Sequence, residues 1–106
     1  MFFGPRVASI TTDELGRELK DGSATLIDVR ELGEFASGHV PGAINLQIGG
    51  LPQSVARRLD HNAEILVICQ SGHSSVRATK RLLKAGFTNV RNVSGGTAAW
   101  RGPLKR

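Results

Sequence analysis

The clearest structural signal in this 106-residue chain comes from one segment, Ile65-Leu66-Val67-Ile68-Cys69-Gln70-Ser71-Gly72-His73-Ser74-Ser75. Its first four residues form a continuous, largely β-branched apolar run, which is typical of a central parallel strand covered on both faces. The polar residues that follow include a glycine and no acid, and they lead into a helix predicted from about Ser75 to Ala85. This order predicts a strand, a loop and a helix, with Cys69 at the carboxyl end of the strand.

The rest of the chain alternates between strand and helix patterns on both sides of this segment. We expect strands at 7–10, 25–29 and 90–93, a short extended piece at 43–46, and helices at about 11–20, 31–37, 51–59 and after 95. On the helix after the central strand, the core-facing residues are predicted to be Val76, Thr79 and Leu83, with Ala78 and Leu82 alongside. The alternation predicts an α/β fold, a mostly parallel central sheet with helices on both faces.

Length and composition narrow the class of protein. The chain is 40% hydrophobic and 22% charged, as in a soluble globular protein, and its size fits one domain over residues 1–106. The longest apolar stretch, Ile65 to Cys69, is too short to cross a bilayer, and residues 1–5 lack the apolar core of a signal peptide. We therefore expect a cytoplasmic protein without membrane contact.

Cysteine and histidine usage limits the chemistry further. One cysteine excludes an intramolecular disulfide, a Cys-x-x-Cys redox pair and any multi-cysteine zinc site. The three histidines, His39, His61 and His73, lack the close spacing that places two ligands on one helix face. We expect no metal and no cofactor, and Cys69 either reacts alone or is inert.

Charge is distributed unevenly along the chain. Residues 1–64 hold six basic and nine acidic residues, a net −3, whereas residues 65–106 hold eight basic residues and no acid, a net +8. Such a basic half favours an anionic partner, either a small oxyanion, a nucleic acid or an acidic protein surface, although it also suits a solvated surface without a partner. Nucleic acid is the weakest of these, because the chain has no tyrosine and one tryptophan for base stacking.

The loop after the central strand suits an anionic sulfur. Ligands of open α/β sheets bind beyond the carboxyl ends of strands, where backbone N–H groups and helix N-termini stabilise negative charge. These groups would favour the thiolate form of Cys69, a nucleophile at neutral pH. Gly72 would let the loop curl with positive φ, and small hydroxyl side chains would leave room for substrate at Ser71, Ser74 and Ser75.

Each of these polar features also has a structural interpretation. Free cysteine is among the most buried residue types, so Cys69 could equally be a packed residue at the strand end. His73 either adds charge near a substrate or faces solvent as an ordinary loop histidine. Asp28 and Arg30 end a buried strand, where we expect the carboxylate to accept loop N–H bonds and the arginine to pair with Glu31 or Glu34.

The sequence as a whole resembles a single-domain rhodanese over almost its full length. Three segments carry the resemblance: Leu26–Glu31 (LIDVRE) with Glu34–Phe35 and Gly38–Asn45 (GHVPGAIN), then Val67–Ser75 (VICQSGHSS), and finally Val93–Trp100 (VSGGTAAW). Together they are highly specific, whereas Cys-x-x-Gly alone would be weak.

The resemblance implies a thiosulfate sulfurtransferase with Cys69 as its catalytic residue. Cys69 would attack the outer sulfur of a small anionic donor such as thiosulfate and pass it, as a persulfide, to cyanide or to a thiol on a small molecule or protein. The substrate-binding loop would comprise Gln70, Ser71, Gly72, His73, Ser74 and Ser75, with Asp28 and Arg30 in support.

One position departs from the family pattern. Many rhodaneses resemble Cys-x-x-Gly-x-Arg-Ser, but this chain has Ser74 at the arginine position, as some short rhodanese-like sulfurtransferases do. The same absence makes a cysteine phosphatase, which clamps phosphate with a loop arginine, the weaker enzymatic interpretation. The alternative from another class is a non-catalytic rhodanese-like module that docks an acidic protein partner.

Overall fold

Strands and helices alternate along residues 6–106, the part of the chain that this computed structural model describes. Residues 1–5, on which the signal-peptide expectation rests, lie outside the described residues. The elements are β1 (Ala8–Ile10), α1 (Thr12–Asp21), β2 (Thr25–Asp28), α2 (Leu32–Ser37), β3 (Ile44–Asn45), the 3₁₀ helix η1 (Ile48–Gly50), α3 (Gln53–Ala56), β4 (Ile65–Ile68), α4 (His73–Lys84), β5 (Val90–Val93) and α5 (Gly96–Ala99).

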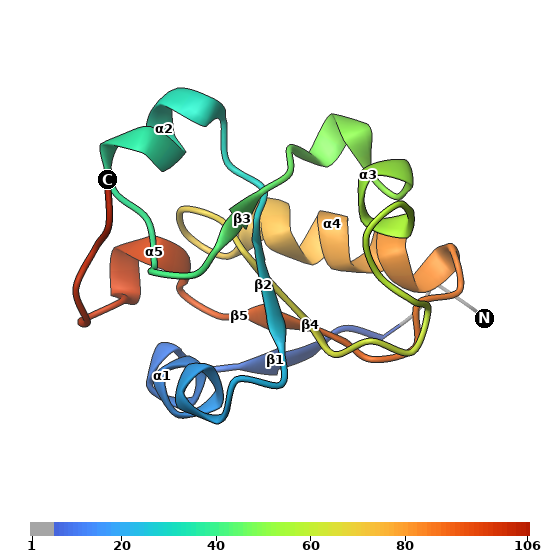
Figure 1. Ribbon diagram of the computed structural model, residues 1–106, viewed down its shortest axis with the longest axis horizontal. Coiled ribbons are helices and arrows are strands. Elements are labelled where there is room, and N and C mark those ends of the chain that lie inside the picture. The colour runs from blue at the N-terminus through green and yellow to red at the C-terminus, as the bar shows by residue number, and fades with distance from the viewer. Residues whose placement is uncertain (1–5) are drawn as a thin grey trace.

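The five strands form one parallel sheet in the order β1-β5-β4-β2-β3, so β4 lies at its centre. Figure 1 shows α1 against one face of the sheet and α3 and α4 against the other. The predicted α/β fold, a parallel central sheet with helices on both faces, is thereby confirmed. Because all strands run the same way, the loops after β2 and β4 meet at one edge of the sheet.

The alternation of side chains along β4 decides which layer each residue joins. Ile65, Val67 and Cys69 point into the core between the sheet and α3–α4, whereas Leu66 and Ile68 join the core under α1. Every residue of β4 is fully buried, as its continuous apolar sequence predicts. Cys69 therefore faces α4, the helix that its own loop begins.

Helix α4 begins two residues before the predicted start. Gly72 is its N-cap with φ +102°, a conformation that favours glycine, so helical geometry starts at His73. The buried stripe of α4 consists of Ser75, Ala78, Thr79 and Leu82, while Val76 and Leu83 are only half-buried. Ala78, Thr79 and Leu82 are thus buried as predicted, whereas Val76 and Leu83 are less buried than predicted. Ser75 joins this face instead, with its hydroxyl towards Cys69.

The helix predicted at 51–59 is shorter than expected. Only α3 is regular there, preceded by η1 and followed by turns, although Leu51 and Val55 are buried as the stripe predicts. No helix within residues 6–106 is both long and apolar enough to span a bilayer.

Candidate active site

The Cys69 sulfur lies in a cradle of hydrogen-bonding groups. The backbone N–H of Gly72 donates to Sγ at 3.1 Å, and Sγ lies 3.3 Å from Oγ of Ser75, to which the thiol donates. The Ser75 hydroxyl donates in turn to Oδ1 of Asn92 on β5, and Nδ2 of Asn92 donates to Oγ of Ser9 at 3.2 Å. A chain of polar side chains, buried as far as Asn92, therefore runs from the sulfur to the exposed Ser9 on β1.

These contacts change the acidity of the thiol. Burial raises the pKa of Cys69, but hydrogen bonds from the Ser75 side chain and from backbone N–H groups of the loop outweigh it, so the pKa lies below its ordinary value. The backbone groups belong to Ser75, Gly72 and Ser71. Because the lowered pKa favours thiolate, Cys69 has the electrostatic surroundings of a reactive cysteine.

Two glycines allow the loop its shape. The φ of Gly72 is positive, as the sequence predicts, and a Cβ there would lie 3.2 Å from the backbone nitrogen of Gly95. At Gly96 a Cβ would overlap the carbonyl oxygens of Cys69 and Gln70. These carbonyls instead accept the N–H groups of Thr97 at 2.9 Å and Ala98 at 3.0 Å. The first turn of α5 therefore holds the backbone of the cysteine loop in place through these two hydrogen bonds.

Cys69 lies in a pocket of about 320 Å³, although the residue is only 3% exposed. The other lining residues are Val29, Arg30, Glu31, Glu34, Ile48, Gln70 and Ser74. Cys69 also contacts the apolar core around Val67 and Ala78, so the structural interpretation of a packed cysteine is partly correct. Its polar neighbours and its access to the pocket distinguish it from an inert core thiol.

The predicted substrate-binding residues divide into three groups. Gln70 and Ser74 line the pocket, while Gly72 and Ser75 contact the sulfur directly. The side chains of Ser71 and His73 are exposed, do not line the pocket, and lie 3.3 Å apart between Oγ and Nδ1. A role in substrate binding stays a prediction for all six residues.

The partner predicted for Arg30 was wrong. Arg30 pairs with Asp28, not with Glu31 or Glu34, and the distance from Nη2 of Arg30 to Oδ2 of Asp28 is 2.9 Å. The physical reason is burial: Asp28 is fully buried and Arg30 8% exposed, and a buried carboxylate needs a buried partner more than an exposed glutamate does. Asp28 also accepts the Arg30 backbone N–H at 3.0 Å, as predicted for a carboxylate at this strand end.

The sequence did not single out several residues of the site. Asn92 contacts Ser75. The sequence signal for it is an uncharged polar residue directly before Val93, the last residue of β5. Glu31 and Glu34 were considered only as partners for Arg30, and Ile48 not at all, yet all three line the Cys69 pocket. Pocket lining by residues from α2 and η1 depends on the tertiary fold, so no local pattern could reveal it.

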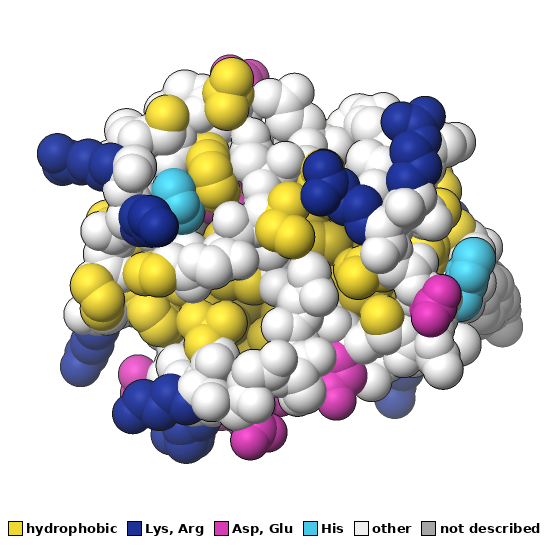
Figure 2. All heavy atoms as spheres, in the orientation of Figure 1, with side chains coloured by type: hydrophobic (Ala, Val, Ile, Leu, Met, Phe, Trp, Pro, Cys, Tyr) yellow, Lys and Arg dark blue, Asp and Glu magenta, His cyan; other side chains and the backbone are white. Residues whose placement is uncertain are grey.

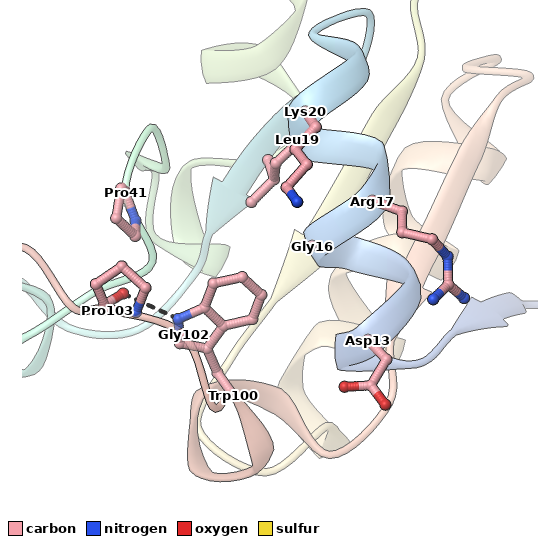
Figure 3. Close-up of a pocket in the computed structure, with 9 residues that line it drawn as sticks. All are labelled: Asp13, Gly16, Arg17, Leu19, Lys20, Pro41, Trp100, Gly102 and Pro103. Carbon is pink, nitrogen blue, oxygen red and sulfur yellow. Dashed lines mark hydrogen bonds between the residues drawn. The ribbon is translucent and has the colours of Figure 1, made fainter.

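A larger groove lies elsewhere, and its lining contains no cysteine, serine or histidine. It measures about 500 Å³ and lies between α1 and the C-terminal segment, where Leu19, Pro41, Trp100 and Pro103 contribute apolar surface. Figure 3 shows the Trp100 ring beside Gly16, with its indole N–H donating to the carbonyl oxygen of Pro103 at 3.0 Å. Figure 2 shows hydrophobic side chains gathered on this side of the molecule. The chemistry of the cysteine loop therefore belongs to the smaller pocket.

Metal chemistry has no candidate centre in the described part of the chain. Within residues 6–106, no group of three or more His, Cys, Asp or Glu side chains is arranged to hold a metal ion.

The sequence model of the rhodanese-like domain matches residues 11–103. The chain therefore belongs to the rhodanese-like domain family, as its resemblance predicted. Its five-stranded parallel architecture is shared with a rhodanese-like domain protein from Staphylococcus aureus, whose crystal structure matches with a TM-score of 0.82 and 30% identity, covering 93% of this chain and 97% of that one.

Three relatives carry names that refer to sulfur chemistry. YtwF of Bacillus subtilis, provisionally named a sulfurtransferase, is 38% identical over 93% of this chain and 95% of its own length. Thiosulfate sulfurtransferase GlpE of Stutzerimonas stutzeri is 35% identical over 83% of this chain and 80% of its own. YrkF of Bacillus subtilis, provisionally named a sulfur carrier protein, is 38% identical over 77% of this chain, which spans 44% of that protein.

Proposed function

We propose that this protein is a sulfurtransferase that carries sulfane sulfur as a persulfide on Cys69. Its small anionic donor, such as thiosulfate, and its thiol or protein acceptor belong to the same proposal. Membership of the rhodanese-like family and the names of the sulfurtransferase relatives support sulfur transfer in general. The cytoplasmic location expected from the sequence stays a prediction.

The reaction divides into two balanced displacements. The Cys69 thiolate attacks the outer sulfur of thiosulfate, the S–S bond of the donor breaks, and sulfite leaves with the bonding electron pair. The outer sulfur of the resulting persulfide is then attacked by cyanide, giving thiocyanate, or by a thiolate, giving a new persulfide. Either acceptor restores the Cys69 thiolate, so the protein needs no oxidant or reductant.

The observation that carries this proposal is the hydrogen bond from the Gly72 N–H to Sγ at the floor of an open pocket. Backbone donors fixed towards the sulfur stabilise negative charge on the thiolate before attack and on the persulfide after it. The helix N-terminus at His73 adds partial positive charge from the same side.

The test is the intact mass of the protein after incubation with thiosulfate. We expect an adduct of one sulfur atom that is lost on adding cyanide, with thiocyanate formed in equal amount. Cys69→Ser should form neither product, whereas Ser23→Ala, which removes an exposed hydroxyl just before β2, at the opposite end of the sheet from the Cys69 loop, should form both. An unmodified wild-type mass with thiosulfate and with inorganic polysulfide would contradict the proposal.

A second candidate function is the docking of an acidic protein without turnover. The exposed face of α4 favours it, because Arg77, Lys80, Arg81 and Lys84 enclose a shallow hollow there, and none of them forms an ion pair within residues 6–106. Four like charges at helical spacing repel one another, so an acidic surface would be attracted to them. Turnover of small donors and acceptors that depends on Cys69 would contradict a purely binding role.

A further inference from the structure

The only cation lining the Cys69 pocket within the described chain, Arg30, uses four of its five N–H groups in hydrogen bonds. Nε donates to both carboxylate oxygens of Asp28 at 3.1 and 3.2 Å, and Nη2 donates to Oδ2 of Asp28 and to the carbonyl oxygen of Gly38. Nη1 donates to Oε1 of Gln70 at 3.2 Å. The charge of Arg30 is thus balanced by the buried carboxylate of Asp28.

The remaining charged groups of the lining are acidic. Glu31 and Glu34 both line the pocket from the start of α2, and neither forms an ion pair in the part of the chain that the structure describes. Ser74 occupies the place on the loop where a basic side chain could have balanced them. Two carboxylates therefore lie along the route to Cys69, with no basic partner among the other lining residues.

One further cation approaches the rim from outside the lining. Arg81 of α4 donates to the carbonyl oxygen of Ile48 at 2.8 Å, and Ile48 lines the pocket. Arg81, Glu31 and Glu34 are all exposed, so solvent screens all three charges, and one guanidinium balances at most one of the two carboxylates. Among the lining residues and this rim contact, two carboxylates therefore stand against one guanidinium that lacks an ion pair.

Building on the proposed sulfurtransfer, we infer that Glu31 and Glu34 select small thiol acceptors by charge, favouring neutral or ammonium-bearing thiols over anionic ones. An ammonium group at the mouth is attracted by both carboxylates while its sulfur reaches Cys69. A carboxylate or sulfonate in the same place is repelled. The backbone donors at the floor act on the sulfur of every substrate alike, so the discrimination arises at the mouth.

The transfer step used for the test is balanced without a further reagent. The thiolate of the acceptor attacks the outer sulfur of the Cys69 persulfide, the S–S bond to Cys69 breaks, and a new persulfide leaves while the Cys69 thiolate is restored. Three acceptors of similar size differ in charge: cysteamine is a cation, 2-mercaptoethanol is neutral and 3-mercaptopropionate is an anion. Cys69 is loaded beforehand with inorganic polysulfide, and the loading is verified by intact mass.

The experiment compares each acceptor with itself across variants, so that differences in intrinsic thiol reactivity cancel. For two exposed carboxylates a few ångströms from the substrate charge, screened Coulomb interaction gives about three- to tenfold per acceptor. We expect the double variant Glu31→Gln/Glu34→Gln to raise the second-order rate constant for 3-mercaptopropionate by that factor and to lower it similarly for cysteamine. The rate constant for 2-mercaptoethanol should stay within about twofold, and salt should shrink the differences between acceptors in the wild type.

The control is Glu64→Gln, which removes one carboxylate, half the charge change of the double variant, just before β4 at the opposite end of the strand from Cys69. Glu64→Gln should leave the order of the three acceptors unchanged. A loaded persulfide whose acceptor preference is the same in wild type and double variant would overturn this inference but leave sulfur transfer intact. A chain that takes up no sulfur on Cys69 would overturn both.

Discussion

Replacing Ser75 with alanine tests whether the hydrogen bonds around Cys69 control its reactivity. Oγ of Ser75 lies 3.3 Å from Sγ, and the hydroxyl has one proton to share between the sulfur and Oδ1 of Asn92. In the thiolate form the sulfur becomes the stronger acceptor, so the hydroxyl turns to donate to it. Ser75→Ala removes this donor and leaves the Gly72 N–H in place. The pKa of Cys69 should therefore rise.

The size of the effect follows from the strength of a charge-assisted hydrogen bond, about 1.5–3 kcal/mol. Since about 1.4 kcal/mol is tenfold in an equilibrium, the thiolate population on the acidic side of the pKa should fall by about ten- to a hundredfold. A more basic thiolate is also more nucleophilic, with a Brønsted coefficient of about 0.4–0.5, which returns roughly half of that loss on a logarithmic scale. The net rate should fall about three- to tenfold at acidic pH and rise by a similar factor at alkaline pH.

The assay is the rate of Cys69 alkylation by iodoacetamide as a function of pH, together with the thiolate absorbance near 240 nm. The two pH profiles, wild type and Ser75→Ala, should cross, with the variant slower below the crossing and faster above it. Ser71→Ala changes a hydroxyl that bonds only to His73 and should reproduce the wild-type profile. A Ser75→Ala profile parallel to the wild type at every pH would refute the reasoning. Such a profile would mean that the pKa of Cys69 is unchanged and that the substitution only disturbs the site.

Three further changes test other contacts of the site. Asn92→Ala removes the competing acceptor of the Ser75 hydroxyl, so the thiolate absorbance should titrate at lower pH than in the wild type; titration at higher pH would contradict this. Gly96→Ala forces a Cβ against the Cys69 and Gln70 carbonyls and should cost several-fold in persulfide formation, measured by intact mass, whereas Gly33→Ala, at a site with open space, should not. Asp28→Asn leaves the buried Arg30 charge unpaired and should lower the free energy of unfolding by about 3–5 kcal/mol in urea titrations; a loss below about 1 kcal/mol would show that the pair contributes little.

The sequence predicts the fold well where one residue pattern has one structural solution. The run from Ile65 to Ile68 is a buried strand as predicted, and α1 begins within one residue of the predicted start, where the capping box of Thr11 and Glu14 has both reciprocal hydrogen bonds formed. Prediction fails by one or two residues where a glycine replaces a side-chain cap, as at Gly72. A cap without a side-chain signal leaves the helix start, and hence its buried face, undetermined by sequence.

The features of the site also differ in whether the sequence predicts them. Cys69 and its loop are predictable because a strand end followed by small polar residues is a local pattern. The pairing of Arg30 with Asp28 depends on which carboxylate is buried, and the contact between Ser75 and Asn92 depends on the packing of α4 against β5. These are long-range consequences of the sheet order, so they become visible only after the strands are assembled.

The pocket has opposite electrostatic character at its two ends, and this bears on the serine at position 74. An arginine there would act on the oxyanion of the donor, which is present in only one half of the proposed cycle. The backbone N–H groups of the loop act on the sulfur attached to Cys69, which both half-reactions share. With Ser74 in place of an arginine, stabilisation is concentrated on the carried sulfur, while Glu31 and Glu34 act in this proposal on the charge of the thiol acceptor. The backbone N–H groups of the loop are thus the donors that both proposed half-reactions use.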